Sequence, residues 1–185
     1  AYETGVKVIS NFRTMDVAAG GEGAPLVPYS EFVLYASPDE NVALQNIGGI
    51  GNVTVLPSTG NMADVYAFDT GPGNMIIDEV MQRLYGRPYD EGGKVAASGV
   101  VNAKMLDELM SHPYISMPLP KSTGREMFGE QYTLGLLERW GNLPAADLIA
   151  TATAFTACTI AEAYRHFIIP KWPINRTVLG GGGAH

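Results

Sequence analysis

Residues 68–77 read FDTGPGNMII, and this stretch joins an expected strand to an expected helix. The apolar run at 63–68 predicts the strand, and apolar side chains at 75, 76, 80 and 84 recur at helical spacing. Asp69, Gly71, Gly73 and Asn74 stand between the two. Glycine lets a ligand approach the backbone, and a carboxylate at a strand end faces the crevice where α/β sheets bind ligands. The stretch therefore predicts an α/β fold with a ligand site at this junction.

Further predicted elements extend this unit in both directions. We expect strands at 6–12, 41–47, 52–56 and 176–179, and helices at 103–111, 128–140 and 145–169. Gly48-Gly49 predicts a tight hairpin between the second and third of these strands, with glycines at positive φ. Asn102 is the expected N-cap of the helix that follows it. The order from residue 41 to 84 is therefore strand, hairpin, strand, strand, helix, which indicates a mixed sheet with flanking helices.

Composition and charge narrow the functional classes. The chain has 185 residues, 46% of them hydrophobic and 17% charged, as in an ordinary globular protein of one domain, or one and a half. Its formal net charge of -7 argues against non-specific nucleic-acid binding. The apolar run at 148–161 is shorter than the roughly 20 residues of a membrane span, so no membrane partner is expected. One cysteine, Cys158, excludes an intrachain disulfide and fits a reducing cytoplasm.

Three glycine-rich turns, each after an expected strand, are the strongest candidate site. Backbone amides without neighbouring Cβ atoms can hold phosphate oxygens, and Gly73 and Asn74 would also lie at a helix N-terminus that favours anions. No Walker A sequence and no cluster of metal ligands is present. The turns predict phosphate contacts from the following residues: Asn46, Gly48, Gly49, Gly51, Asn52, Asp69, Gly71, Gly73, Asn74, Gly180, Gly181, Gly182 and Gly183.

Two aspartates have open interpretations. Asp69 could hold Mg²⁺ beside phosphates, directly or through water, or it could form an N-cap or Asx turn for the next helix. Asp16 lies in a glycine-rich segment next to Arg13. A carboxylate in such a loop can be a general base, and the spacing alone leaves that role open.

Six segments together resemble one enzyme family over essentially the whole chain. They are NFRTMDVAAGGEGAPLVP, QNIGGIGNVTVLP, FDTGPGNMIIDEVMQRLYG, PKSTGREMFG, DLIATATAFTACTIAEAY and VLGGGGAH. The chain is similar to the anhydro-N-acetylmuramic acid kinases, which belong to the actin, Hsp70 and sugar-kinase superfamily. The resemblance implies a ribonuclease-H-like domain, one of two that enclose ATP in that fold.

The resemblance also implies a reaction and its residues. The family uses ATP, Mg²⁺ and water to convert 1,6-anhydro-N-acetylmuramic acid to N-acetylmuramic acid 6-phosphate in peptidoglycan recycling. Its motif Asp-x-Ala-x-Gly-Gly-x-Gly-Ala-Pro places the catalytic base at Asp16, with Arg13, Gly20 and Gly21 near the sugar. Residues 46–52 match the second phosphate loop and residues 180–184 the adenosine motif. In the signature at 121–126, Arg125 and Glu126 would contact sugar or phosphate, or would form a structural salt bridge.

One departure from the family pattern shapes the expected domain organisation. The glycine, threonine, serine and aspartate motif of the first phosphate loop has no match. We therefore expect a piece of a longer protein: residues 1–38 as the trailing part of a first domain with the catalytic-aspartate loop, and 39–185 as a second domain truncated at its adenosine motif. Such a piece should have little kinase activity alone. The family resemblance suggests a cytoplasmic homodimer, and the alternative function is an actin- or Hsp70-like ATPase acting as chaperone or scaffold.

Overall fold

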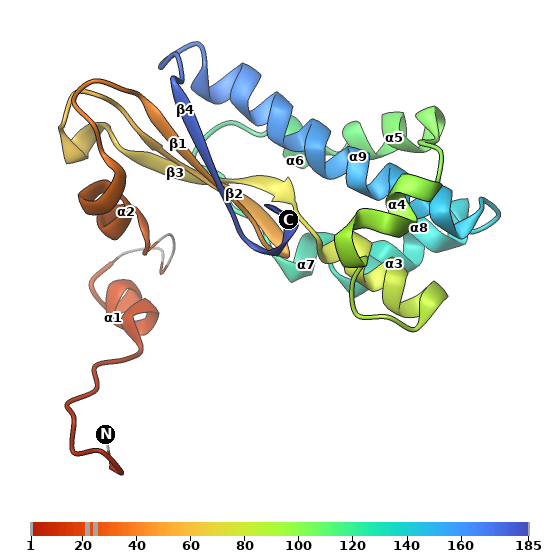
Figure 1. The fold of residues 1–185 in the computed structure, drawn as a ribbon, viewed down its shortest axis with the longest axis horizontal. Coiled ribbons are helices and arrows are strands. Elements are labelled where there is room, and N and C mark those ends of the chain that lie inside the picture. Colours follow the sequence, from red (N-terminus) through yellow and green to blue (C-terminus); the bar gives the residue numbers. More distant parts are fainter. Residues whose placement is uncertain (1, 21–22, 24–25, 185) are drawn as a thin grey trace.

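A four-stranded mixed sheet forms the centre of the protein in the computed structural model, which describes residues 2–20, 23 and 26–184 (Figure 1). Strands β1 (Val42–Ile47), β2 (Ile50–Leu56) and β3 (Tyr66–Pro72) form an antiparallel meander. Strand β4 (Arg176–Gly180) pairs with β1 in parallel. The resulting order β3-β2-β1-β4 confirms the predicted mixed α/β sheet and matches the start of a ribonuclease-H-like domain.

Helices cover the two faces of this sheet unequally. Helix α9 (Ala145–Ala163) and the π-helical turn Tyr164–Ile168 pack on one face, where Ala43, Val53 and Phe68 contact Ala163 and Ile168. Helix α2 (Pro28–Tyr35) lies against the opposite face, next to Leu44 and Leu56. That second face is left partly open, and a cavity of about 920 Å³, the main cavity, lies there.

A second core lies beside the sheet, among helices that follow β3. It is built around Phe128, Phe155, Met81, Met105 and Leu136, all of which are fully buried. The helices of this region are α3 (Met75–Tyr85), α4 (Lys94–Ser98), α5 (Ala103–Met110), α6 (Pro113–Ser116), α7 (Arg125–Phe128) and α8 (Glu130–Trp140). Short 3₁₀ turns lie before β3 at Met62–Asp64, before α4 at Glu91–Gly93 and after β4 at Gly182–Ala184. The first half of α9 completes this core, so α9 ties the sheet to the helices.

Capping residues in the sequence explain several helix boundaries. Asn102 caps α5 as predicted, since its side-chain oxygen accepts from the Met105 amide at 3.0 Å. Gly86 ends α3 in the left-handed conformation with φ 63°. The predicted helix at 145–169 is also confirmed, apart from its π-helical last turn. No helix in the described ranges has both the length and the hydropathy that a membrane crossing requires.

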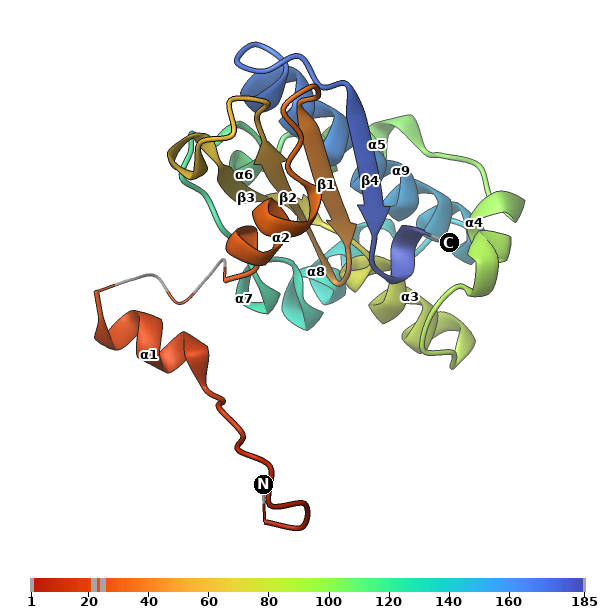
Figure 2. The same ribbon diagram turned by 60° about the vertical axis from the view of Figure 1, so that its left-hand side comes forward.

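Three expectations about local structure are wrong. Residues 6–12 form no strand, because no strand in the described ranges pairs with them. Instead the chain enters α1 (Phe12–Ala18), which projects away from the body in both views (Figures 1 and 2). Strand β3 continues through Asp69 to Pro72, so Asp69 lies inside a strand and not after it. Gly48 and Gly49 do not adopt positive φ in the β1–β2 hairpin.

Candidate functional site

The glycine turns at residues 46–52 and 69–74 are joined by backbone hydrogen bonds. The carbonyl oxygens of the β1–β2 hairpin accept from the first amides of α3: Asn74 donates to Gly48 at 2.8 Å, and Gly73 and Met75 donate to Gly49 at 2.9 and 3.1 Å. The amides of Gly73 and Asn74, which were expected to be open to an anion, thus already have carbonyl partners. Carbonyl capping of α3 instead fixes the position of the hairpin.

The third glycine turn, at residues 180–183, packs against the other two. At Gly181, a Cβ would lie 2.5 Å from the Ile47 carbonyl oxygen, and at Gly183 it would lie 2.7 Å from the Asn74 Oδ1. Glycine is thus the residue that lets this turn lie directly on the hairpin and on the start of α3. All three turns predicted to bind phosphate are adjacent in space, although residues 46 and 183 are far apart in the sequence.

The predicted glycines divide into two groups by exposure. Gly51, Gly71 and Gly73 are buried, and added Cβ atoms there would crowd the Thr70 hydroxyl, the Thr159 side chain and the Gly51 amide. These three glycines therefore have a packing role in the fold. Gly48 and Gly49 lie at the surface, and within the described ranges neither of their amides donates to another protein group. Gly180, Gly181, Gly182 and Gly183 are likewise exposed.

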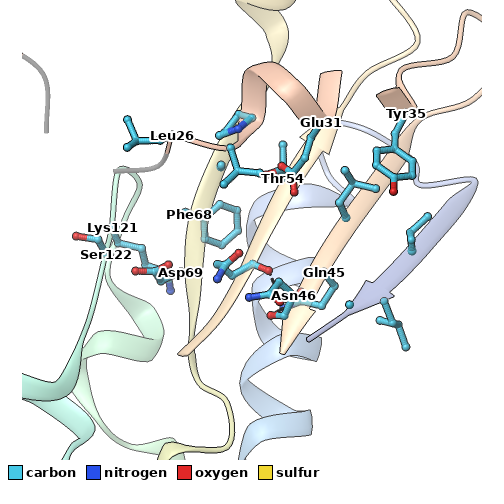
Figure 3. A pocket seen from close by; sticks show the side chains of 18 of the residues that line it. Leu26, Glu31, Tyr35, Gln45, Asn46, Thr54, Phe68, Asp69, Lys121 and Ser122 are labelled. Atoms are coloured by element: carbon cyan, nitrogen blue, oxygen red, sulfur yellow. Dashed lines mark hydrogen bonds between the residues drawn. The ribbon is translucent and has the colours of Figure 1, made fainter. Parts of the chain in front are cut away.

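A polar row crosses the sheet next to these turns. Asn46 on β1 lies opposite Asn52 on β2, which lies opposite Asp69 on β3. On the other side of Asn46, the register places Gly180 of β4, which adds no side chain to the row. All four residues line a cavity of about 920 Å³, and Figure 3 shows several of its lining side chains, including Asn46 and Asp69. The row provides carboxylate and amide groups beside the glycine turns.

The surroundings of Asp69 bear on the capping alternative. Its Oδ2 accepts from the Thr123 amide at 2.8 Å, and its carbonyl oxygen accepts from the Tyr114 hydroxyl at 2.7 Å. Helix α3 has Asn74 at its N-cap and no side-chain capping bond, so the N-cap alternative for Asp69 is wrong. Burial raises the pKa of Asp69, the Thr123 hydrogen bond lowers it, and the negative charge of Glu126 raises it.

The donors around Asp69 fit a magnesium ion bound together with a ligand's phosphates. Mg²⁺ prefers hard oxygen ligands and usually takes only one or two carboxylates from the protein. Asp69 provides one carboxylate, Glu126 is close enough to raise its pKa, and Asn46 and Asn52 add side-chain carbonyls along the row. Among the described residues, no group of three or more His, Cys, Asp or Glu side chains forms a self-sufficient metal site.

Asp16 lies on α1 and not in a loop. Its Oδ2 accepts from the Gly23 amide at 2.8 Å, while the Arg13 guanidinium donates to the Gly23 carbonyl at 2.6 Å. Arg13 lines the main cavity, and Asp16 is half-exposed one turn further along the same helix. Gly20 has φ 92° and open space around it, and Gly21 lies outside the described residues. The two side chains thus hold both backbone polar groups of a single residue, Gly23.

Arg125 and Glu126 begin helix α7 and are both exposed. Within the described ranges neither side chain forms a salt bridge, which argues against the structural alternative for this pair. Of the two, Glu126 affects the polar row, because its negative charge raises the pKa of Asp69. Arg125 stands apart from the residues that line the main cavity.

A smaller cavity of about 440 Å³ lies on the other side of the third glycine turn. Gly182 and Gly183 line it together with Asp78 of α3, Tyr89 and Thr153 of α9. Burial raises the pKa of Asp78, and its carboxylate has no hydrogen-bond partner among the described side chains. Sequence reasoning missed Asp78 and Tyr89. Asp78 follows the Asn74 N-cap by one helical turn, a spacing that could have indicated that it lies near the same turn.

Fold and site together define a class of protein. The β3-β2-β1-β4 sheet, with glycine turns meeting where β1, β3 and β4 end, is the arrangement of the actin and sugar-kinase superfamily. A family model described as "Anhydro-N-acetylmuramic acid kinase" matches residues 1–185. The chain therefore belongs to the anhydro-N-acetylmuramic acid kinase family.

Curated relatives agree with this assignment. Two proteins with that name are similar to the whole chain: one from Clostridioides difficile (strain 630) is 59% identical over 185 residues, and one from Bacillus cereus (strain ATCC 14579) is 56% identical over 185 residues. The matched region is 48% of the first protein and 47% of the second. The chain spans about half the length of the curated relatives it matches.

Proposed function

We propose that the protein containing this chain converts 1,6-anhydro-N-acetylmuramic acid, water and ATP to N-acetylmuramic acid 6-phosphate and ADP. The observation that carries the proposal is the meeting of three glycine turns at one end of the sheet, beside a large cavity. Open amides of Gly48 and Gly49 and the exposed turn at 180–183 would hold the phosphates. The 920 Å³ cavity beside them is within the usual size range for a small-molecule site.

The chemistry needs a base, and Asp16 is the proposed one. Water would attack the anomeric carbon, the bond between that carbon and O6 would break, and O6 would take the γ-phosphoryl group of ATP. The proton of the attacking water would pass to the Asp16 carboxylate. Its half-exposed position, held by the Gly23 amide, leaves one carboxylate oxygen for that water. Arg13, Gly20 and Gly21 on the same segment, and Arg125 and Glu126 on α7, would contact the sugar.

Asp69 is the proposed protein ligand of Mg²⁺, directly or through a water molecule. When bound, the ion would neutralise charge on the phosphates and help to orient them. Asn46 and Asn52 flank Asp69 in the polar row and would hydrogen-bond phosphate oxygens or metal-bound water. Glu126 adds a second negative charge that favours a cation at this point.

The nucleoside and the domain arrangement complete the proposal. The 440 Å³ cavity beside Gly182 and Gly183 would take the adenosine. Residues 1–38 would belong to a first domain and 39–185 to a second, with the sugar and the phosphates between them. The exposed apolar side chains of Phe12, Val33 and Leu34 fit burial against such a domain. We further propose that the enzyme is cytoplasmic and forms a homodimer.

Replacement of the base tests this function. In the full-length protein, Asp16→Asn should lower turnover with anhydro-sugar by about 10²–10⁴-fold, the usual contribution of general-base catalysis. ATP affinity, measured by titration calorimetry, should stay nearly unchanged. Asp39→Asn, which changes an exposed carboxylate outside both cavities, is the matched control. Full turnover in the Asp16 variant would remove Asp16 as the base, and sugar-independent ATP consumption by the parent protein would favour an actin-like ATPase.

A further inference from the structure

Lys121 is a buried cation without a carboxylate partner in the part of the chain that the structure describes. The residue is 6% exposed. Its ammonium donates to the carbonyl oxygens of Tyr114 at 3.3 Å and Ile115 at 3.2 Å. It also lies 4.7 Å from the ring centroids of both Tyr114 and Phe167. Burying a charge is unfavourable, and here carbonyl dipoles and aromatic faces offset the cost where an acidic group would usually do so.

The groups that hold this ammonium also hold Asp69. The Lys121 carbonyl oxygen accepts from the Asp69 amide at 3.4 Å, and the Thr123 amide donates to the Asp69 Oδ2 at 2.8 Å. On the other side, the Tyr114 hydroxyl donates to the Asp69 carbonyl oxygen at 2.7 Å. The Lys121 side chain connects these two supports, because its ammonium binds the Tyr114 carbonyl and lies against the Tyr114 ring.

We propose that Lys121 is a positioning residue, whose ammonium locks Tyr114 and the segment 121–123 around Asp69 and so fixes the direction of the Asp69 carboxylate. Asp69 is on β3, at the edge of the sheet, so no further strand among the described residues holds it on that side. The segment 121–123 takes the place of such a strand. The consequence for Mg²⁺ and ATP rests on the proposed function, whereas the effect on the Asp69 backbone does not.

A methionine at position 121 separates positioning from ordinary core packing. Methionine fills an aromatic cage with an unbranched apolar chain, and replacing a buried charge with an apolar group is often neutral for stability. Lys121→Met should therefore keep the fold while it removes the connection between Tyr114 and the segment 121–123. Tyr114→Phe removes only the hydrogen bond from the Tyr114 hydroxyl to the Asp69 carbonyl oxygen, and it should likewise weaken the positioning of Asp69. Lys171→Met is the matched control, because Lys171 is exposed and lies 4.9 Å from the Tyr66 ring centroid, away from Asp69.

The experiment uses the full-length protein and has two readouts. Amide hydrogen exchange should become at least tenfold faster at Asp69 and Thr123 in Lys121→Met, with unchanged exchange in β1 and β2. The affinity for ATP with Mg²⁺ should fall about tenfold, while the affinity for ATP without metal should stay within twofold. Lys171→Met should change neither quantity.

Each outcome bears on a separate part of the proposal. Exchange at Asp69 and Thr123 that matches the Lys171 control would overturn the positioning role. Faster exchange spread over the whole sheet would overturn it as well, in favour of a purely structural lysine. If Asp69→Asn has the same ATP affinity as the parent both with Mg²⁺ and without it, the metal role proposed for Asp69 fails. Locally faster exchange in Lys121→Met would then still support the positioning of Asp69.

Discussion

Replacement of Gly73 should destabilise the contact between the β1–β2 hairpin and α3 directly. A Cβ at this position would overlap the Gly48 carbonyl oxygen and lie 3.2 Å from the Gly51 amide nitrogen, both of which are backbone atoms. Gly73→Ala must therefore move the β1–β2 hairpin away from the start of α3. Three hydrogen bonds of 2.8, 2.9 and 3.1 Å join these two elements. At about 0.5–1.5 kcal/mol each, their loss would lower the free energy of unfolding by about 1.5–4.5 kcal/mol.

Urea unfolding of the full-length protein, followed by circular dichroism, measures this loss. With an m-value of about 1–3 kcal/mol/M, a loss of about 3 kcal/mol moves the midpoint down by about 1–3 M. Gly49→Ala is the matched control, since its Cβ would meet only the Met75 Cε at 3.7 Å, an ordinary contact. Both variants gain the same small benefit from a less flexible unfolded chain, so their difference isolates the clash. Equal midpoints for the two variants would refute the close approach of hairpin and helix.

Three further predictions concern the two cavities and the extent of the chain. Gly180→Ala should leave the unfolding midpoint unchanged, because nothing lies within 4 Å of its Cβ, yet it should weaken nucleotide binding by narrowing the main cavity. Asp78→Asn should weaken ATP binding in calorimetry without changing inorganic phosphate binding, and Asp107→Asn on the exposed side of α5 serves as its control. Burial raises the pKa of the Asp78 carboxyl above 3.8, so the folded protein binds the carboxyl proton more tightly than the unfolded chain does. The contribution of this carboxyl to the free energy of unfolding is therefore lost as the pH rises from 3.8 through the raised pKa. Across that pH window, urea melts should show the stability of Asp78→Asn increasing relative to that of the parent. Residues 1–185 alone should show little or no anhydro-sugar kinase activity in a coupled ADP assay, and turnover like that of the full-length protein would contradict this.

The sheet could be predicted from local patterns because its first three strands are consecutive. Val42, Leu44, Val53 and Val55 are short-range signals of strands, and the intervening glycines mark the hairpin. The pairing of β4 with β1 could not be predicted in this way, because it joins residues that are more than 130 positions apart. The segment at 6–12 shows the opposite failure. Its β-branched residues resemble a strand, but strand formation needs a partner, and none pairs with it in the described ranges.

For the site, the sequence indicated which turns matter but not what each residue does in them. Asp69, Asn46 and Asn52 were predicted singly, and only the strand register aligns them as one row. The amides of Gly73 and Asn74 were expected to be open, yet tertiary contact with the hairpin uses them. Lys121 carries a further role that its position in the sequence does not show, because its partners Tyr114 and Phe167 come from separate helices.

The glycines themselves give an argument for a ligand. Gly51, Gly71, Gly73 and Gly181 are required by the fold, since a Cβ at each would lie 3.2 Å or less from another protein atom. Gly49 and Gly180 have no such reason: neither adopts positive φ, and a Cβ at either would have room. Glycine in a strand or hairpin costs conformational entropy, so its presence there without a structural need points to something outside the chain that must approach the backbone. Gly49 and Gly180 lie at the hairpin and at the end of β4, beside the polar row, where phosphates are proposed to bind.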